Sequence, residues 1–397
     1  MPPSLPEIRL GRKGEERVRS GHLWVFGDDL REVPAGIPPG EWVLARSRSG
    51  DLLGTGTLNL SSRISLRIVS RGAVSPTESF VSERIGEALR RRNEAGMGGL
   101  SALRLLYSEG DFLPGVIADR YGGVLVVQIL TAGMERVREQ IVSALVAACS
   151  PRLIFERSEG GGRRQEGLSE RRGPLYGEGD TAEEVEIDGC RFRVDVETGP
   201  KTGFFLDQRE NRRIVREMAG GRTVLDGFCS TGAFGILALA GGARNVLAVD
   251  ASEPAVRAAG ENAARNGFGG RWEGRAGDLF REMRAMLEAG RRFGLVVLDP
   301  PSFAKSREGR EGALRGYRDI NRLGFLLAEP GGIVATSSCT QLIDMAKWME
   351  ALRDAAADAA VDAQLLRRGG QPADHPVLLG MPETEYLKFA VFRKREP

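Results

Sequence analysis

Five polar residues between positions 223 and 339 lie where apolar segments give way to short loops. They are Asp226, Asp250, Asp278, Asp299 and Cys339. The apolar segments are typical of buried strands, and helix-like stretches separate them, as in a βαβ series. Because the carboxyl ends of parallel strands meet at one edge of a sheet, we expect these side chains to line a single crevice. The sequence predicts that the chemistry of this protein takes place there.

The loop after the first apolar segment indicates a nucleoside cofactor. Residues 224–235 read VLDGFCSTGAFG, and Asp250 follows by about twenty residues, as a ribose-binding acid does in dinucleotide folds. The loop glycines lack the tight spacing that seats a pyrophosphate, and Asp226 is unfavourable beside a phosphate. A cationic nucleoside without phosphates fits better, which predicts S-adenosylmethionine with Asp250 at the ribose and Asp278 near the adenine amine. A loop that serves only packing is the alternative, and the acids at the next two strand ends argue against it.

The segment Asp-Pro-Pro-Ser-Phe at 299–303 is the second chemical signal. Proline fixes its own φ and keeps the preceding residue extended, so Asp299 should be held rigidly beyond its strand. A fixed carboxylate can accept hydrogen bonds from a base, and Phe303 could stack on that base. A rigid turn with a core phenylalanine is the alternative. Because Ser302 stands where an aromatic residue would suggest methylation of an amino group, that reaction is less favoured.

Cys339 follows the apolar run Gly332–Thr336 among small polar residues and indicates the type of reaction. Carbon 5 of a pyrimidine is not nucleophilic by itself. A thiolate that adds to carbon 6 creates an enamine that can attack a methyl sulfonium, which is covalent catalysis. A buried, inert cysteine is the alternative, since free cysteines are often buried. The position at a strand end favours the nucleophile.

Further segments resemble one known family. They are GHLWVF at 21–26, DFLPGVIADRY at 111–121, TGPKTGFFLDQRENR at 198–212, DHP at 374–376 and YLK at 386–388. With the site above, the chain resembles the bacterial 23S ribosomal RNA 5-methylcytosine methyltransferases of the RlmI type. These are class I methyltransferases with an N-terminal PUA domain. The resemblance covers nearly the whole chain and implies a methyltransferase, a transferase that acts in rRNA processing.

The resemblance and the loops together give a set of candidate site residues. The expected catalytic residues are Cys339 and Asp299, and the expected substrate-binding residues are Pro300, Phe303 and Lys201. The expected cofactor-binding residues are Gln208, Asp226, Phe228, Cys229, Ser230, Thr231, Gly232, Asp250, Ala251, Ser252, Asp278, Leu279 and Asp299.

The predicted fold class is α/β, with three domains. Residues 1–73 should form a small β-barrel, PUA-like RNA-binding domain, and residues 74–190 a central α+β domain. Residues 191–397 should form a Rossmann-like class I methyltransferase domain.

Several elements can be expected within these domains. They are helices over 82–92, 134–148 and 254–266, a hairpin around 121–123, and a last strand over 386–392 that closes the sheet's edge in an antiparallel hairpin. The Gly- and Arg-rich stretch 159–173 is too polar to pack, so we expect a mobile or phosphate-binding loop.

Composition favours a cytoplasmic enzyme with RNA as partner. The net charge is only +2, and six of the 56 basic residues are lysines. Arginine suits phosphate binding and base stacking, although genomic base composition explains such a bias equally well. The four cysteines show no metal-ligand spacing, and no apolar run can span a bilayer, so neither a metal nor a membrane is expected. A homodimer is compatible with the sequence.

Three functions remain open from the residues alone. The favoured one is methylation of carbon 5 of a cytosine in RNA. The second is methylation of a guanine or adenine amino group, with Asp299 active and Cys339 idle. The third is a non-catalytic RNA-binding or ribosome-assembly protein, which the intact acids at three strand ends argue against. His22 is expected to be structural, and His375 either lines the crevice or holds a loop.

Overall fold

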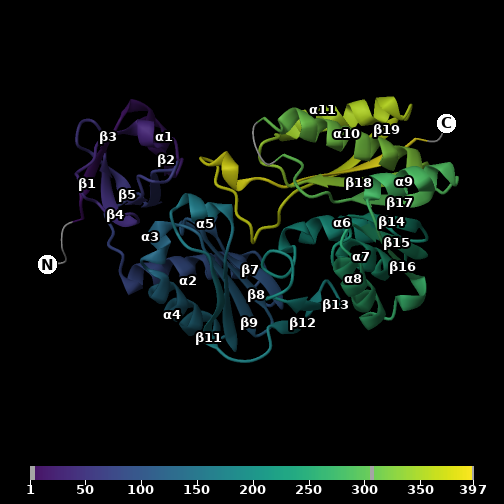
Figure 1. Ribbon diagram of the computed structural model, residues 1–397, viewed down its shortest axis with the longest axis horizontal. Coiled ribbons are helices and arrows are strands. Elements are labelled where there is room, and N and C mark those ends of the chain that lie inside the picture. The colour runs from purple at the N-terminus through teal and green to yellow at the C-terminus, as the bar shows by residue number, and fades with distance from the viewer. Residues whose placement is uncertain (1–4, 305–307, 396–397) are drawn as a thin grey trace. The chain divides into compact units, whose positions relative to one another are not determined.

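The computed structural model describes residues 5–304 and 308–395, which form two compact units (Figure 1). The N-terminal unit comprises the residues up to Val185, then Arg193–Leu206 and Ala373–Thr384. The C-terminal unit comprises Glu186–Phe192, Asp207–Pro372 and the residues from Glu385 onward. Each unit is therefore built from segments that are distant in sequence.

A six-stranded sheet begins the N-terminal unit, with strand order β2-β6-β5-β4-β1-β3. Its elements are β1 (Glu7–Leu10), α1 (Arg12–Arg19), β2 (Trp24–Val25), η1 (Gly27–Asp29), β3 (Leu30–Glu32), β4 (Glu41–Arg46), β5 (Leu52–Leu58) and β6 (Leu66–Ser70). β1 is parallel to β4, and the other pairs are antiparallel. Inward side chains such as Ile8, Val43 and Ile68 form its core. The short strands expected here are present.

The second sheet has the order β11-β10-β9-β8-β7. The elements of this region are α2 (Glu78–Glu94), β7 (Ala102–Tyr107), η2 (Ser108–Asp111), β8 (Val116–Tyr121), β9 (Val124–Ile129), α3 (Ala132–Glu135), α4 (Arg138–Cys149), β10 (Leu153–Ser158), α5 (Gly161–Gln165) and β11 (Arg171–Gly177). The antiparallel hairpin of β8 and β9 confirms the expected turn at 121–123. The helix expected over 82–92 is longer, because the Thr77 side chain caps it by accepting from the Phe80 amide. The helix expected over 134–148 is two helices, α3 and α4.

The expectation that the Arg-rich stretch 159–173 cannot pack is wrong. It contains helix α5 and the start of β11, which pairs antiparallel with β10. Arg163 is only 1% exposed, and its guanidinium donates to Ile129 O and, at 2.8 Å, to the Glu135 carboxylate. An arginine whose charge is paired can be buried even in a segment whose composition suggests a solvated loop. Arg164 remains exposed.

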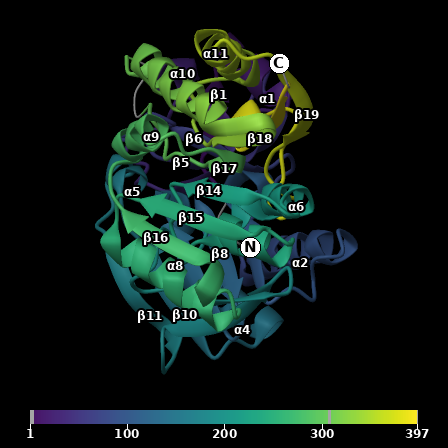
Figure 2. The ribbon, with the colours of Figure 1, turned by 90° about the vertical axis from the view of Figure 1, so that its right-hand side faces the viewer.

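The C-terminal unit contains a seven-stranded sheet with the order β16-β15-β14-β17-β18-β20-β19. Its strands are β14 (Thr223–Gly227), β15 (Asn245–Asp250), β16 (Trp272–Ala276), β17 (Phe293–Leu298), β18 (Ala328–Ser338), β19 (Ala363–Gly369) and β20 (Lys388–Lys394). The first five in this order are parallel, whereas β20 is antiparallel to both of its neighbours. Figure 2 shows the twisted strands at this end of the molecule. This is the open, mainly parallel sheet of a Rossmann-like fold.

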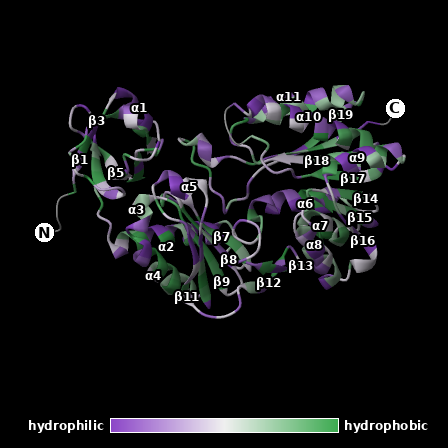
Figure 3. Ribbon diagram, viewed as in Figure 1, coloured by the Kyte–Doolittle hydropathy of each residue, from purple (hydrophilic) through white to green (hydrophobic). Residues whose placement is uncertain are grey.

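Helices cover both faces of this sheet. They are α6 (Arg209–Met218), α7 (Ala233–Ala240), α8 (Glu253–Arg265), α9 (Leu279–Glu288), α10 (Arg310–Leu327) and α11 (Met345–Asp358), with short turns η3 (Leu206–Gln208), η4 (Gly269–Arg271) and η5 (Pro382–Thr384) along the chain. Alternate residues of a strand face opposite sides, so Leu225 packs with α9 to α11 and Val224 packs with α6 to α8. Strands β14, β15 and β17 consist mainly of buried apolar residues, and the hydrophobic colour marks this part of the ribbon (Figure 3). A separate two-stranded sheet of β12 (Ala182–Ile187) and β13 (Cys190–Asp195) precedes this domain in sequence.

Helix α8 and strand β20 correspond to two elements expected from the sequence. The helix expected over 254–266 is α8, displaced by one residue at each end. The last strand is antiparallel as expected, but it begins at Lys388 and lies inside the sheet, with β19 outside it. The expected antiparallel pair at the sheet's edge is therefore present, with β19 as its outermost strand.

The histidines hold loops of the N-terminal unit. His22 Nδ1 accepts from the Trp24 amide, and His22 Nε2 lies 3.1 Å from a Glu383 carboxylate oxygen. His375 is 1% exposed, and its Nδ1 lies 2.8 Å from an Asp374 carboxylate oxygen. His22 is structural, as expected, and the burial of His375 agrees with the loop-holding alternative.

Candidate active site

The loop between β14 and α7 has a tightly folded backbone. Phe228, Ser230 and Gly232 have φ values of 62°, 47° and 81°, the left-handed region. Gly235, in the first turn of α7, lies so close to the sheet that an added Cβ would be 2.9 Å from an Asp226 carboxylate oxygen. Small residues are required here because the backbone itself approaches the strand ends.

Asp226 is buried beneath this loop. Its Oδ2 accepts the Gly235 amide at 2.8 Å, while Oδ1 has no hydrogen-bond partner among the described residues. Burial raises the pKa of Asp226 to about 7, against the lowering effect of the Gly235 amide. An unpartnered carboxylate oxygen in a buried position favours a cationic or hydrogen-bond-donating ligand.

Asp250 ends β15 beside the same loop. Its two carboxylate oxygens accept the Ser230 amide at 3.0 Å and the Ser252 amide at 2.9 Å. These contacts hold the carboxylate at the edge of the sheet, and the remaining lone pairs can accept ribose hydroxyls. The geometry thus agrees with the ribose-binding role expected from sequence.

The other predicted cofactor residues differ in their accessibility. Asp278, Ala251 and Ser252 are exposed, and the Asp278 and Ser252 side chains also cap α9 and α8. Leu279 is 3% exposed and packs in the core, so only its backbone can face a ligand. The Thr231 carbonyl accepts from the Asn262 side chain. Asp278 follows β16, and β16 lies beside β15.

Asp299 ends β17 and is held by polar side chains. Gln208 Nε2 donates to Asp299 Oδ1 at 2.8 Å, and the Ser337 hydroxyl donates to the same oxygen. Gln208 is itself fixed by Asn211, whose Nδ2 donates to Gln208 Oε1 at 2.6 Å. Burial raises the pKa of Asp299 to about 6, opposed first by the Ser337 hydrogen bond. Gln208, expected at the cofactor, thus supports the Asp299 carboxylate.

The aromatic ring of Phe303 is half-buried rather than free in solvent. It contacts Tyr317 with ring centroids 4.9 Å apart and Phe280 at 6.3 Å. Pro300 is buried, so its contribution is to hold Asp299 rigid. Phe303 can present one remaining surface to a base.

Cys339 directly follows β18 and is partly exposed. The neighbouring hydroxyls form a cluster in which Ser338 Oγ donates to Tyr317 Oη at 2.9 Å and Tyr317 Oη lies 2.8 Å from Thr340 Oγ1. Cys229, by contrast, is 6% exposed, and burial raises the pKa of its thiol strongly. Of these two cysteines, only Cys339 has the accessibility that a nucleophile requires.

The substrate-binding role expected of Lys201 stays a prediction. Lys201 belongs to the N-terminal unit, where it is exposed, has a φ of 51° and lies over the Phe205 ring at 4.9 Å. Sequence reasoning gave no role to Tyr317, Arg212 or Lys388. The sequence does carry one signal for Lys388, because this lysine precedes the apolar run Phe389–Phe392.

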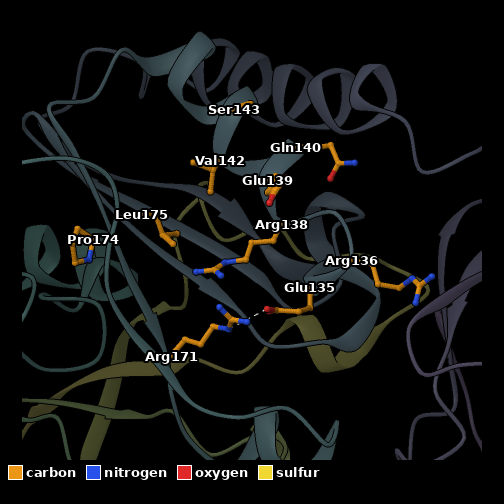
Figure 4. Close-up of a pocket in the computed structure, with 10 residues that line it drawn as sticks. All are labelled: Glu135, Arg136, Arg138, Glu139, Gln140, Val142, Ser143, Arg171, Pro174 and Leu175. Atoms are coloured by element: carbon orange, nitrogen blue, oxygen red, sulfur yellow. Dashed lines mark ion pairs between the residues drawn. The ribbon is translucent and has the colours of Figure 1, made fainter.

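A cavity of about 700 Å³ lies elsewhere, within the N-terminal unit (Figure 4). Helices α3 and α4 and strand β11 line it. Its arginines are ion-paired, for example Arg171 with Glu135 at 3.2 Å and Arg138 with Glu156. None of the predicted site residues lines this cavity.

Comparison with known proteins identifies the family. Residues 118–385 match a family of S-adenosylmethionine-dependent methyltransferases, and residues 8–71 match a PUA-like domain. The chain is 39% identical to ribosomal RNA large subunit methyltransferase I of Tolumonas auensis, over 97% of this chain and 98% of that protein. It is also 39% identical to the Aeromonas hydrophila protein of the same name, over 98% and 99% of the two chains. The chain belongs to this methyltransferase family.

Solved structures agree with the fold of the methyltransferase. A chain from Streptococcus mutans described as SAM-dependent superposes with a TM-score of 0.84 at 21% identity, covering 98% of this chain and 100% of that one. Another methyltransferase, in complex with SAH, gives a TM-score of 0.85 at 21% identity with the same coverage. The expected α/β class with an N-terminal PUA-like domain is confirmed.

The cofactor is S-adenosylmethionine, as expected from the sequence. The observed residues fit it, because Asp226 offers an unpartnered buried oxygen and Asp250 is fixed at the end of the adjacent strand. Residues 5–304 and 308–395 contain no group of three or more His, Cys, Asp or Glu side chains that could hold a metal ion. In the same residues no helix has the length and apolarity to cross a membrane.

Replacing Asp250 with alanine should weaken cofactor binding by about 1–3 kcal/mol, the scale of charge-assisted hydrogen bonds. The variant should still fold, because Asp250 is half-buried and its side chain bonds the Ser230 and Ser252 amides at the edge of the sheet rather than the core. Isothermal calorimetry with S-adenosylmethionine measures the change, and thermal unfolding of the same variant checks that the fold is kept. Unchanged affinity in Asp250→Ala would remove Asp250 from the cofactor site.

Proposed function

We propose that this methyltransferase transfers a methyl group to carbon 5 of a cytosine in large-subunit ribosomal RNA through a covalent adduct with Cys339. The names of its relatives support ribosomal RNA of the large subunit as substrate. The observation that carries the chemistry is the adjacency of β17 and β18, which Asp299 and Cys339 directly follow. Ser337, two residues before the cysteine, donates a hydrogen bond to Asp299. A nucleophile and an acid thus stand at neighbouring strand ends.

The proposed reaction begins with the addition of the Cys339 sulfur to carbon 6 of the base. A base in structured RNA must be unstacked before a side chain can reach carbon 6. Phe303 stacks on the extruded cytosine, and the Asp299 carboxyl faces its amino edge. As the Cys339 sulfur forms a bond to carbon 6, Asp299 donates its proton to ring nitrogen 3, which receives the displaced electron pair. The raised pKa of Asp299, about 6, suits a proton donor better than an ordinary carboxyl.

The product forms by reversal of the addition. S-adenosylmethionine supplies a methyl group on a sulfonium to carbon 5 of the resulting enamine. A water held by Asp299 removes the carbon-5 proton and passes it to the Asp299 carboxylate, and ring nitrogen 3 returns its proton to solvent. The electron pair of the broken carbon–hydrogen bond restores the double bond between carbons 5 and 6 as the Cys339 thiolate leaves carbon 6. The segment after β17 contains no cysteine, so a second thiol does not assist release.

Amino-group methylation remains the competing function, because Asp299 could orient an exocyclic amine without any thiol. Trapping on RNA that carries 5-fluorocytosine separates the two, since fluorine at carbon 5 cannot be removed as a proton. With the cofactor present, we expect a denaturation-resistant protein–RNA complex at Cys339, located by peptide mass spectrometry. Methylation of unsubstituted RNA without any trapped complex would favour the amine reaction.

The N-terminal domain and the stretch 159–173 should supply phosphate contacts that orient the RNA. Deleting residues 1–73 is a poor test, because Trp42 and Val69 share a core with residues of α2 and β7. Exposed Arg63 and Arg164 are better targets, whereas buried Arg163 is not. Arg63→Glu with Arg164→Glu should weaken RNA binding and lower the slope of log affinity against log salt by roughly 1–2. An unchanged slope, with unchanged cofactor affinity as the control, would exclude both arginines.

A further inference from the structure

Lys388 is a buried lysine at the start of β20. It pairs with Ser338 across the β18–β20 ladder and is 6% exposed. Its ammonium donates to the carbonyls of Thr340 and Tyr386, each at 2.9 Å. Thr340 directly follows Cys339, so the positive charge lies beside the proposed nucleophile. Both of these acceptors are carbonyl oxygens rather than carboxylates.

A buried ammonium is costly unless a negative charge balances it. Burial lowers the pKa of Lys388, and a negative charge on the Cys339 sulfur would oppose this more than the carboxylates of Glu385 and Asp344 do. Both of those carboxylates are exposed to solvent, where their charge is screened. The electrostatic attraction between two groups is mutual. An ammonium that a negative charge on the sulfur stabilises therefore stabilises that negative charge in return.

The other titratable group next to Cys339 is Tyr317 of α10. Its hydroxyl bonds with Ser338 and Thr340, and burial raises its pKa. Tyr317 therefore stays neutral and contributes no positive charge to the thiol. Lys388, by contrast, brings a positive charge to this strand end.

We propose that Lys388 is a positioning residue that keeps the Cys339 sulfur deprotonated, an inference that rests on the proposed function of Cys339. The thiol proton leaves to solvent before RNA binds, and the ammonium retains its protons throughout. The sulfur electron pair forms the bond to carbon 6 and returns to sulfur on elimination. Lys388 stabilises the negative sulfur at both stages without contacting the base.

The test measures the reactivity of Cys339 in the full-length protein without RNA. Iodoacetamide alkylation is followed across pH by mass spectrometry of the Cys339 peptide, so the other cysteines do not interfere. Lys388→Met should move the midpoint of alkylation to higher pH, because a nearby positive charge lowers the pKa of a thiol by about one unit or more. Alkylation at neutral pH should accordingly slow by about tenfold. Lys388→Arg should retain the wild-type midpoint.

Lys394→Met is the matched control. Lys394 lies in the same strand and donates to the carbonyls of Phe325 and Ala328 at 3.1 and 3.0 Å, away from Cys339. A purely structural role in satisfying carbonyls predicts similar effects of the two Met variants, whereas our proposal predicts a shift only at position 388. If Lys388→Met does not fold, Lys388→Gln keeps hydrogen-bond donors without the charge and should show the same shift.

The outcomes separate this inference from the function on which it rests. An unchanged alkylation midpoint in folded Lys388→Met or Lys388→Gln overturns the role of Lys388, even if Cys339 proves essential. A shifted midpoint together with full methylation by Cys339→Ser supports the charge effect but overturns covalent catalysis. A shifted midpoint and an inactive Cys339→Ser support both.

Discussion

Cys339→Ser should abolish RNA methylation, with a loss of turnover of roughly 10⁴-fold or more, the scale seen when a covalent nucleophile is removed. A serine hydroxyl has nearly the same size as the thiol but does not ionise near neutral pH, so it cannot add to carbon 6. Single-turnover methylation with saturating cofactor measures the chemical step. Calorimetry should show unchanged binding of S-adenosylmethionine, because the cofactor loop is formed by other residues.

Cys229→Ser is the matched control for this substitution. Cys229 lies in the cofactor loop and is 6% exposed, and burial holds its pKa far above the ordinary value. It therefore cannot act as the nucleophile, and its variant should remain largely active. Full methylation by Cys339→Ser would refute covalent catalysis and support the transfer of methyl groups to a base amine.

Asp299→Asn should lower turnover by roughly 10²–10⁴-fold, the contribution of a positioned general acid. The amide keeps the shape and can still contact Gln208 and Ser337, but it cannot donate a carboxyl proton to ring nitrogen 3. Cofactor affinity measured in parallel distinguishes a catalytic loss from a binding loss. Near-normal turnover in the variant would show that the base needs no proton from Asp299.

The pH dependence gives a second measure of Asp299. Its pKa is raised to about 6, so the proton-donating form predominates below that pH and is lost as the pH rises through it. The falling limb of the rate profile should therefore belong to Asp299 and disappear in Asp299→Asn. Ser337→Ala removes a hydrogen bond that lowers this pKa, so its falling limb should move to higher pH. A limb that does not move in Ser337→Ala belongs to another group.

Much of the active site is determined by local sequence. The alternation of apolar strands with helix-like stretches places Asp226, Asp250 and Asp299 at the ends of parallel strands, because strand direction fixes which end carries the following loop. The small residues of the β14–α7 loop are required by backbone conformation and close approach. These features depend on neighbours in sequence, so they could be predicted without the fold.

Other features were decided by tertiary contacts between distant segments. Arg163 is buried because Glu135, 28 positions away, pairs with it, which no property of its own polar segment indicates. Gln208 supports Asp299 across 91 positions, and Lys388 reaches Thr340 because the antiparallel register places it opposite Ser338. Burial of a charge depends on whether a partner from elsewhere satisfies it. Composition and spacing place the reactive groups at one sheet edge, but only the register of that sheet determines which charges surround them.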